Sequence, residues 1–360
     1  MHLKVLAVNS LLRDLEREYS VIRTKIAENE DEELYLDVWK RAQADSPWFQ
    51  DHRPYAPIFK EELDAAQAAF RDSNSKCWIV MDDGNAAGVL ACRKGKDIAR
   101  LGSGDREPAV LPSYRPASAG IKLLDAALEW SIEQGLPGVF TLLKLPPGID
   151  PRTQWHVELC FQWGMKLTRL AVQLGARIHK TEEYANPQVR FKGVSYVGLD
   201  CFCDLILRSF ESTRKFEYDP FVHDPFKVRS VPSRIYETEP DGMFVAYIRD
   251  EPVGLVVTQA PIPVFKDPMC GLIAVIGVLP EYREKKIGMS LLQKAHNYII
   301  GKGYGYSFVG TSESNVASTA LYHGMGYHPV YRILKFVKVI KDVNIPRDLL
   351  PHNFNELCPL

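Results

Sequence analysis

The sequence lacks a surplus of either charge and lacks any long apolar run. Its 44 Lys and Arg residues nearly balance 45 Asp and Glu residues, for a formal net charge of −1. A dedicated nucleic-acid-binding protein normally carries a basic excess. No apolar run approaches the ~18 residues that a membrane-spanning helix needs. We therefore expect no nucleic-acid partner and no membrane partner.

The sequence also lacks a paired pattern of cysteines. The seven cysteines are scattered, and none forms a C-x-x-C pair. Neither a disulfide framework nor a zinc site is expected, and no metal is predicted. The stretch 1–18 has too short an apolar core, with charges close behind it, for a secretion signal. These features predict a cytoplasmic protein, either a monomer or a homodimer.

What the chain does have is length and an internal repeat. Its 360 residues exceed what one core usually holds. Residues 110–140 match residues 278–308 at a constant offset of 168, with twelve of 31 positions identical. We interpret this match as a duplicated domain. The polar stretch 179–188 is the expected join, so the predicted domains are 1–180 and 181–360.

Strands alternate with helices in both halves. In the second half the pattern predicts a hairpin, a buried strand, an amphipathic helix, a strand, a helix and a final strand, at residues 243–260, 271–278, 287–300, 306–311, 315–323 and 330–340. The first half follows the same order. This order predicts an α/β (α+β) fold of two tandem domains, each with a mixed central sheet flanked by helices.

The stretch from Val278 into the helix at 287 has the features of an anion site. A strand ends, a short loop follows and a helix begins, so the first backbone N–H groups of the helix lack partners. Arg283, Lys285 and Lys286 add positive charge, and Gly288 permits close backbone approach. A pyrophosphate fits this arrangement. The alternative from this segment alone is a solvated basic helix terminus.

Two motifs together resemble the GNAT acyltransferase superfamily. Arg283 and Gly288 match its coenzyme A signature R/Q-x-x-G-x-G/A, and "NVASTALYHGMGY" (315–327) matches its later signature N-x-x-A-x-x-L-Y. Two positions depart from the family pattern, because Lys286 replaces the first glycine and Ser318 replaces the alanine. We expect a helical φ at Lys286, which tolerates a side chain, or a lysine that itself reaches a phosphate.

The resemblance implies an acyltransferase that moves an acetyl or other acyl group from coenzyme A to an amine acceptor, with acetyl-CoA as co-substrate and a small molecule as acceptor. In the family, the diverging fourth and fifth strands hold the pantetheine arm and polarise the thioester carbonyl. The residues expected to bind the cofactor are Ile276, Val278, Arg283, Glu284, Lys285, Lys286, Ile287, Gly288, Met289, Asn315 and Ser318.

Tyr322 and Glu313 are the predicted catalytic residues. By its match to the family position, Tyr322 protonates the departing thiolate as general acid; the alternative is a packed core aromatic. Glu313 is the nearest acidic candidate for a general base, and the alternative is an exposed loop carboxylate. Asn315 is also a helix N-cap by residue type.

The first half is a degenerate copy. It keeps Arg115 and Gly120, but Pro116 removes one N–H donor from the loop. Cys160 aligns with Tyr322, and no N-x-x-A-x-x-L-Y run precedes it. We therefore expect one acyl-CoA per chain, held by the C-terminal half. Three alternatives remain: acyl-CoA in both halves, a longer or unusual acyl donor, and a non-catalytic acyl-CoA sensor or scaffold.

Overall fold

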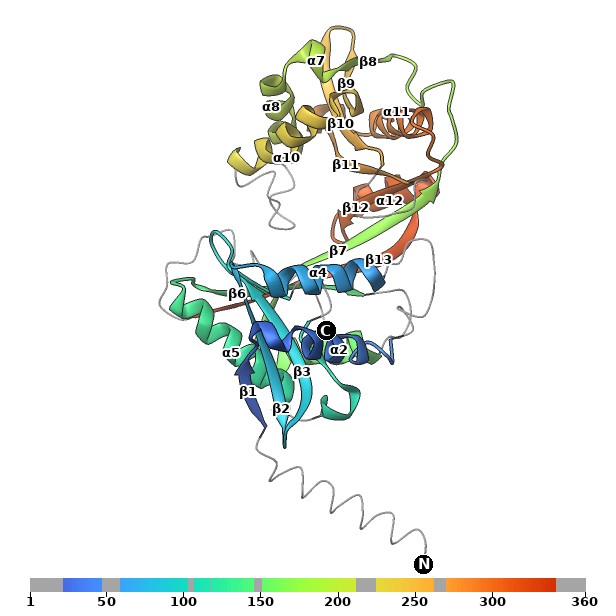
Figure 1. Cartoon of the computed structure of the whole chain (residues 1–360). Coiled ribbons are helices and arrows are strands. Elements are labelled where there is room, and N and C mark those ends of the chain that lie inside the picture. The colour runs from blue at the N-terminus through green and yellow to red at the C-terminus, as the bar shows by residue number, and fades with distance from the viewer. Residues whose placement is uncertain are drawn as a thin grey trace, which may run out of the picture.

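A computed structural model of the chain describes residues 22–46, 59–102, 107–116, 118–145, 151–211, 225–261 and 270–340. Within these ranges one 13-stranded sheet runs through the whole molecule. Figure 1 shows two lobes, each with its own helices, and strands β7 and β13 running from one lobe to the other. None of the helices in the described ranges has the length and apolar character of a membrane-spanning helix.

The N-terminal half contains, in chain order, β1 (Arg23–Ile26), α2 (Glu32–Arg41), α4 (Phe59–Arg71), β2 (Ser75–Asp82), β3 (Asn85–Arg93), β4 (Ala99–Leu101), β5 (Ala109–Val110), α5 (Ala119–Glu133), β6 (Gly138–Leu145), α6 (Pro151–Gln162) and β7 (Lys166–Arg177). A short 3-10 turn, Pro112–Tyr114, precedes α5.

The C-terminal half contains β8 (Val189–Gly193), α7 (Val194–Val197), α8 (Leu199–Phe210), α10 (Pro225–Thr238), β9 (Met243–Ile248), β10 (Glu251–Gln259), β11 (Cys270–Val278), α11 (Ile287–Gly301), β12 (Tyr306–Ser312), α12 (Val316–Gly324) and β13 (His328–Val339). The 3-10 turn Pro280–Tyr282 precedes α11. The two halves repeat one order of elements, which confirms the predicted tandem α/β fold with a mixed sheet.

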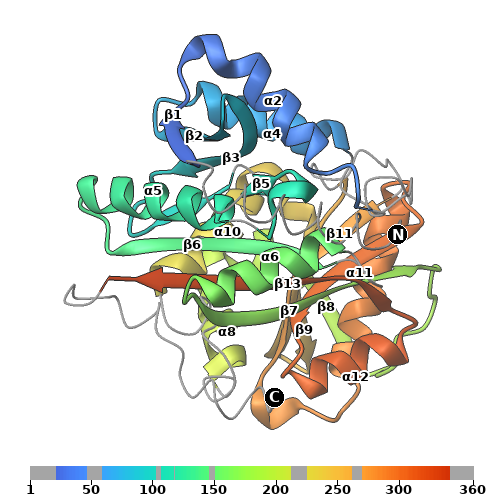
Figure 2. The ribbon, with the colours of Figure 1, turned by 90° about the horizontal axis from the view of Figure 1, so that it is seen from below.

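The two halves exchange their last strands. The strand order is β1-β2-β3-β4-β6-β13-β7-β12-β11-β10-β9-β8, so β13 lies between β6 and β7. Strand β13 pairs antiparallel with both neighbours, and β7 pairs antiparallel with β12 on its other side. In Figure 2, β6, β13 and β7 lie side by side. Each half therefore completes its sheet with a strand from the other half.

The hydrophobic cores follow the same exchange. Leu334 and Phe336 of β13 pack in the N-terminal core with residues of β2, β3 and α5. In turn, Val172 and Leu174 of β7 pack in the C-terminal core with residues of α11. Neither core is complete without a strand from the other half of the sequence.

Helices cover both faces of the sheet because strand residues alternate in direction. Side chains of β2 at Trp78 and Val80 pack under α5 and α6, whereas those at Cys77 and Ile79 pack under α2 and α4. The C-terminal half repeats this layering, with α11 and α12 on one face and α8 and α10 on the other.

Candidate active site

The candidate site begins where β11 and β12 part. These strands pair in parallel only from Cys270 to Ile273 of β11, although β11 continues to Val278 and pairs with β10 along its other edge. Beyond Ile273, no described strand pairs with the edge of β11 that faces β12. The diverging strands implied by the family resemblance are therefore present, with an open backbone edge on β11.

Alternation along β11 fixes which backbone groups reach this open edge. The N–H of Leu279, the residue after β11, donates to the carbonyl of Val253 in β10 at 3.0 Å. Backbone groups of alternate residues in a strand point to opposite edges, so those of Ile276 and Val278 point away from β10. The Val278 carbonyl accepts a hydrogen bond from Arg283 Nε at 3.3 Å. The remaining groups of Ile276 and Val278 face the open edge.

The loop from β11 to α11 presents a run of backbone donors. The N–H groups of residues 284–289 make no backbone hydrogen bond within the described part of the chain. Glu284 and Lys286 have positive φ values of 64° and 57°. The predicted helical φ at Lys286 is wrong, because this N-cap residue is left-handed. A glycine at that position adopts this conformation without the steric cost that a side chain brings.

A cavity of about 470 Å³ joins the open edge of β11 to the start of α11. Every predicted cofactor residue except Lys285 lines it: Ile276, Val278, Arg283, Glu284, Lys286, Ile287, Gly288, Met289, Asn315 and Ser318. The ammonium group of Lys285 instead donates to the carbonyl of Glu281 at 3.1 Å and lies over the ring of Tyr282. The described residues contain no group of three or more His, Cys, Asp or Glu that could hold a metal.

Sequence reasoning missed several residues that line the cavity, namely Ser209, Phe210, Gly277, Tyr282, Ala317 and Leu321. Ser209 and Phe210 come from the last turn of α8, on the opposite face of the sheet from α11. A Cβ at Gly277 would lie 2.8 Å from the Ser209 Cβ, so the glycine permits this close packing. No local pattern marks α8 as a neighbour, because the contact depends on how the strands are ordered.

Arg283 ties the loop to its surroundings. Besides its bond to Val278, its Nη2 donates to the carbonyl of Ser209 at 2.8 Å. Arg115 in the N-terminal half makes the same two contacts, to the carbonyls of Val110 at 3.3 Å and Ala42 at 2.8 Å. The repeated arginine thus fastens the loop to the strand before it and to a helix end on the far face, a structural role shared by both halves.

Tyr322 lies behind the cavity wall. Its side chain is 3% exposed and packs in the C-terminal core. Burial raises its pKa well above the ordinary value, and the nearby Ser318 side chain opposes that shift. Ser318 itself lines the cavity. Asn315 is the N-cap of α12, and its side-chain oxygen accepts the Ser318 N–H at 3.1 Å.

Glu313 lies apart from the cavity lining. Its carboxylate forms an ion pair with Arg332 of β13, and its N–H donates to the carbonyl of Leu170 in β7 at 3.3 Å. Its role as general base therefore stays a prediction. His296 does not line the cavity either. It is buried, and its Nε2 lies 2.8 Å from the hydroxyl of Tyr327.

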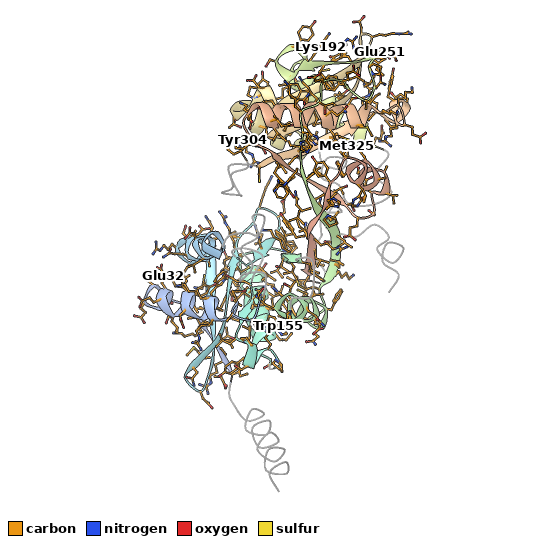
Figure 3. The ribbon with its side chains drawn as sticks, turned by 90° about the vertical axis from the view of Figure 1, so that its right-hand side faces the viewer. Glu32, Trp155, Lys192, Glu251, Tyr304 and Met325 are labelled. Carbon is orange, nitrogen blue, oxygen red and sulfur yellow. The ribbon has the colours of Figure 1, made fainter. Side chains whose placement is uncertain are left out.

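The matching region of the N-terminal half is filled by Trp155. Its indole N–H donates to the carbonyl of Arg115 at 3.1 Å, and the Arg115 guanidinium lies 5.4 Å from the ring centre. A Cβ at Gly120 would lie 3.2 Å from the Trp155 ring. Asp45 pairs with Arg115 at 2.9 Å. Figure 3 shows Trp155 in the lower lobe. The N-terminal loop is therefore covered by an aromatic side chain and its arginine is neutralised.

Comparison with known families gives two matches along the chain. The model of the acetyltransferase (GNAT) family matches residues 32–145 and again residues 204–327. The duplication predicted from the internal repeat is therefore confirmed. A search of curated protein sequences finds no match.

Solved structures share the fold at low sequence identity. A GCN5-related N-acetyltransferase from Sphaerobacter thermophilus has a TM-score of 0.58 and 16% identity, over 88% of this chain and 95% of that one. A tandem GNAT protein from the clavulanic acid biosynthesis pathway has a TM-score of 0.52 and 15% identity, over 88% and 98%. A GCN5-related glucosamine N-acetyltransferase region of a fungal multi-domain GH3 β-N-acetylglucosaminidase has a TM-score of 0.58 and 16% identity, but this chain spans 38% of that longer protein.

Proposed function

Because the chain belongs to the acetyltransferase (GNAT) family, we propose that it moves an acetyl group from acetyl-CoA to the amine of a small-molecule acceptor. The observation that carries this proposal is the cavity of about 470 Å³, which connects the start of α11 with the open edge of β11. The end at α11 suits the pyrophosphate of coenzyme A, and the end at β11 suits the amide groups of its pantetheine arm.

The pyrophosphate lies at the start of α11. Helix N-termini bind anions through unpaired N–H groups and the helix dipole. Here the N–H groups of residues 284–289 supply the donors, and the Lys286 ammonium adds positive charge beside them. The pantetheine arm continues along β11, where its amides pair with backbone groups of Ile276 and Val278. An N–H on this edge polarises the thioester carbonyl as the oxyanion develops.

Tyr322 supplies the proton that the leaving thiolate needs. The acceptor amine attacks the thioester carbonyl, the C–S bond breaks, and its electron pair stays on sulfur. The Ser318 hydroxyl, which lines the cavity one helical turn before Tyr322, gives its proton to sulfur and takes the proton of Tyr322. The proton lost by the amine restores Tyr322. Glu313 remains the proposed base that carries this proton from the amine to Tyr322, and it acts through water because it lies apart from the cavity lining.

A single site per chain is part of this proposal. In the N-terminal half, Trp155 covers the loop and Asp45 neutralises Arg115. Pro116 also lacks the N–H that Glu284 keeps at the matching position. The corresponding helix N-cap, Ser118, has φ −70°, so the left-handed turn that exposes the donors around Lys286 is absent there.

The experiment that tests the proposal is a screen of small amines, aminoglycosides and peptides with release of free thiol as readout. With an active acceptor, Tyr322→Phe should lower turnover by roughly 10²-fold or more, the usual contribution of a general acid, and change acetyl-CoA affinity little, because the hydroxyl acts mainly in the transition state. Tyr304→Phe is a matched control, since Tyr304 packs against the same core but takes no part in the proposed proton path.

Two outcomes would count against the proposal. Unchanged turnover of Tyr322→Phe across the pH range would remove Tyr322 from the mechanism. Acetyl-CoA binding without thiol release in the presence of any acceptor would favour the alternative function, a non-catalytic acyl-CoA sensor.

A further inference from the structure

The segment that joins the two halves is fastened along α11. Between β7 and β8, the N–H of Thr181 donates to Asn297 Oδ1 at 2.8 Å, and Asn297 Nδ2 donates back to the Thr181 carbonyl at 2.7 Å. The N–H of Ala185 donates to Gln293 Oε1 at 2.7 Å. Residues 290, 293 and 297 lie on one face of the helix, so this segment follows a single helix face.

At its far end this segment reaches the loop before α11. Asn186 Nδ2 donates to the carbonyl of Lys285 at 2.9 Å. The N–H of Asn186 donates to Ser290 Oγ at 2.9 Å, and the Ser290 hydroxyl donates to the carbonyl of Lys286 at 3.2 Å. Ser290 is fully buried. Two successive carbonyls of the loop are therefore held by Asn186 and its partner.

Holding these carbonyls also orients N–H groups. In a trans peptide the C=O and the following N–H point in opposite directions. The bond from Asn186 to the Lys285 carbonyl therefore turns the Lys286 N–H away from Asn186. The bond from Ser290 to the Lys286 carbonyl does the same for the Ile287 N–H. Both Lys286 and Ile287 line the cavity, and a carbonyl that accepts a hydrogen bond makes the N–H of its own peptide a stronger donor.

The conformation of the loop makes such a hold necessary. Lys286 has φ 57°, and a left-handed conformation is unfavourable for a residue with a side chain. The loop keeps this conformation only if its surroundings fix it. Asn186 and Ser290 contact the two carbonyls on either side of the Lys286 φ and ψ angles, so they hold the strained residue directly.

We propose that Asn186 is a positioning residue for the acyl-CoA site, one that fixes the loop so that its N–H groups converge on the pyrophosphate. This proposal rests on the proposed function, because it assumes that acyl-CoA occupies the cavity. It assigns a role to residues 181–186, between β7 and β8, beyond connecting the two halves. The chain that leaves β7 sets the geometry of the cofactor site.

The test compares two ligands and three variants of the full chain. We expect Asn186→Ala to weaken coenzyme A binding about tenfold, the size expected for one lost hydrogen bond to a charged ligand. Pantetheine lacks the pyrophosphate, so its binding should not change. Gln293→Ala is the matched control, because it removes a contact of the same segment with the same helix but leaves Lys285 and Lys286 held.

Asn186→Asp guards against a folding defect. It keeps the size of the side chain and the Oδ1 atom that accepts the Gln188 N–H at 2.9 Å, but it replaces the donor to Lys285 by a carboxylate oxygen and adds a negative charge. We expect at least the same loss of coenzyme A affinity. Calorimetry measures coenzyme A, ligand-observed NMR measures pantetheine, and thermal unfolding checks the fold.

The outcomes separate this inference from the function on which it rests. Equal losses for coenzyme A and pantetheine, equal losses in Asn186→Ala and Gln293→Ala, or no loss in Asn186→Ala would overturn the positioning role. A wild-type chain that binds no coenzyme A would instead overturn the proposed function itself.

Discussion

Lys286 carries two properties that substitution can separate, a positive charge and a left-handed backbone. Its φ of 57° and ψ of 15° place it at the N-cap of α11. The ammonium group attracts an anion, whereas the backbone conformation carries a steric cost that a glycine would not have. Both properties belong to one residue at the mouth of the cavity.

Replacing Lys286 by glycine and by alanine separates the two properties. Both variants lose the ammonium group, and only the glycine variant relieves the left-handed strain. We expect the free energy of unfolding of Lys286→Gly to exceed that of Lys286→Ala by about 1 kcal/mol. Urea denaturation of the two variants measures the difference. Equal stabilities would show that the backbone at this residue is not strained.

His296 predicts how stability depends on pH. The buried imidazole lies 2.8 Å from the Tyr327 hydroxyl, which itself donates to Ser307 Oγ at 2.8 Å. Because the Tyr327 hydroxyl gives its proton to Ser307, it accepts a hydrogen bond from His296 Nε2. Burial lowers the pKa of His296 to about 4, below the usual 6.5 of a histidine in the unfolded chain.

Proton binding by His296 makes the folded chain less stable as the pH falls. Between pH 6.5 and 4 the unfolded chain binds a proton at His296 that the folded chain does not, so stability is full near pH 7 and falls with pH across this window, by on the order of 3 kcal/mol. His296→Gln keeps a donor for Tyr327 but cannot titrate. Urea denaturation at pH 7 and pH 4.5 should show a larger loss in the wild type than in the variant. Equal losses in both proteins would assign the pH dependence to other groups.

At the scale of elements, β13 belongs to one half by sequence and to the other by packing. Phe336 is fully buried and lies in the N-terminal core. Phe308 of β12 is equally buried, but it packs with Cys270 of β11 in the C-terminal half. The two phenylalanines are close in sequence and serve different halves.

This difference predicts where each substitution loosens the structure. Phe336→Ala and Phe308→Ala should each cost about 3–5 kcal/mol, the usual range for a buried phenylalanine. Hydrogen exchange in Phe336→Ala should rise in β2 and α5, far away in sequence. In Phe308→Ala it should rise in β11 and β12. Faster exchange confined to the C-terminal half in both variants would contradict the strand exchange.

The sequence predicted the elements of the C-terminal half well, because their signals are local. The helix expected at 287–300 is α11, and the strand expected at 271–278 is β11. The exchange of β7 and β13 had no such signal, since each strand has the same local pattern whichever sheet it joins. The boundary predicted near residue 180 stays a prediction, and the join it marks lies between β7 and β8.

For the candidate site too, the sequence indicated the residues with a local signal and missed those that depend on packing. The residues predicted to bind the cofactor on β11 and the α11 loop are close together in sequence, and all of them except Lys285 line the cavity. The conformation of Lys286 was not predicted, because a left-handed lysine depends on contacts from Asn186 and Ser290 across the fold. The contributions of Ser209 and Phe210 depend on the packing of α8 against β11, which no motif records.

At the scale of the whole molecule, the two halves repeat one order of elements, but the loops before α5 and α11 differ. Both halves keep the arginine that fastens the loop. The C-terminal half combines a left-handed N-cap, an open strand edge and a cavity that joins the two. Trp155 occupies the corresponding region of the other half. We therefore propose one acyl-CoA per chain, bound at α11.

Calorimetric titration with acetyl-CoA tests this claim most directly. Lys286 and Ser118 are matched, exposed N-cap residues of α11 and α5, whereas Gly120 is buried and a charge there would perturb the fold. We predict one site in the wild type, binding at least about tenfold weaker in Lys286→Glu because a carboxylate repels the pyrophosphate, and unchanged binding in Ser118→Glu. Two sites in the wild type, or loss of binding only in Ser118→Glu, would contradict the account.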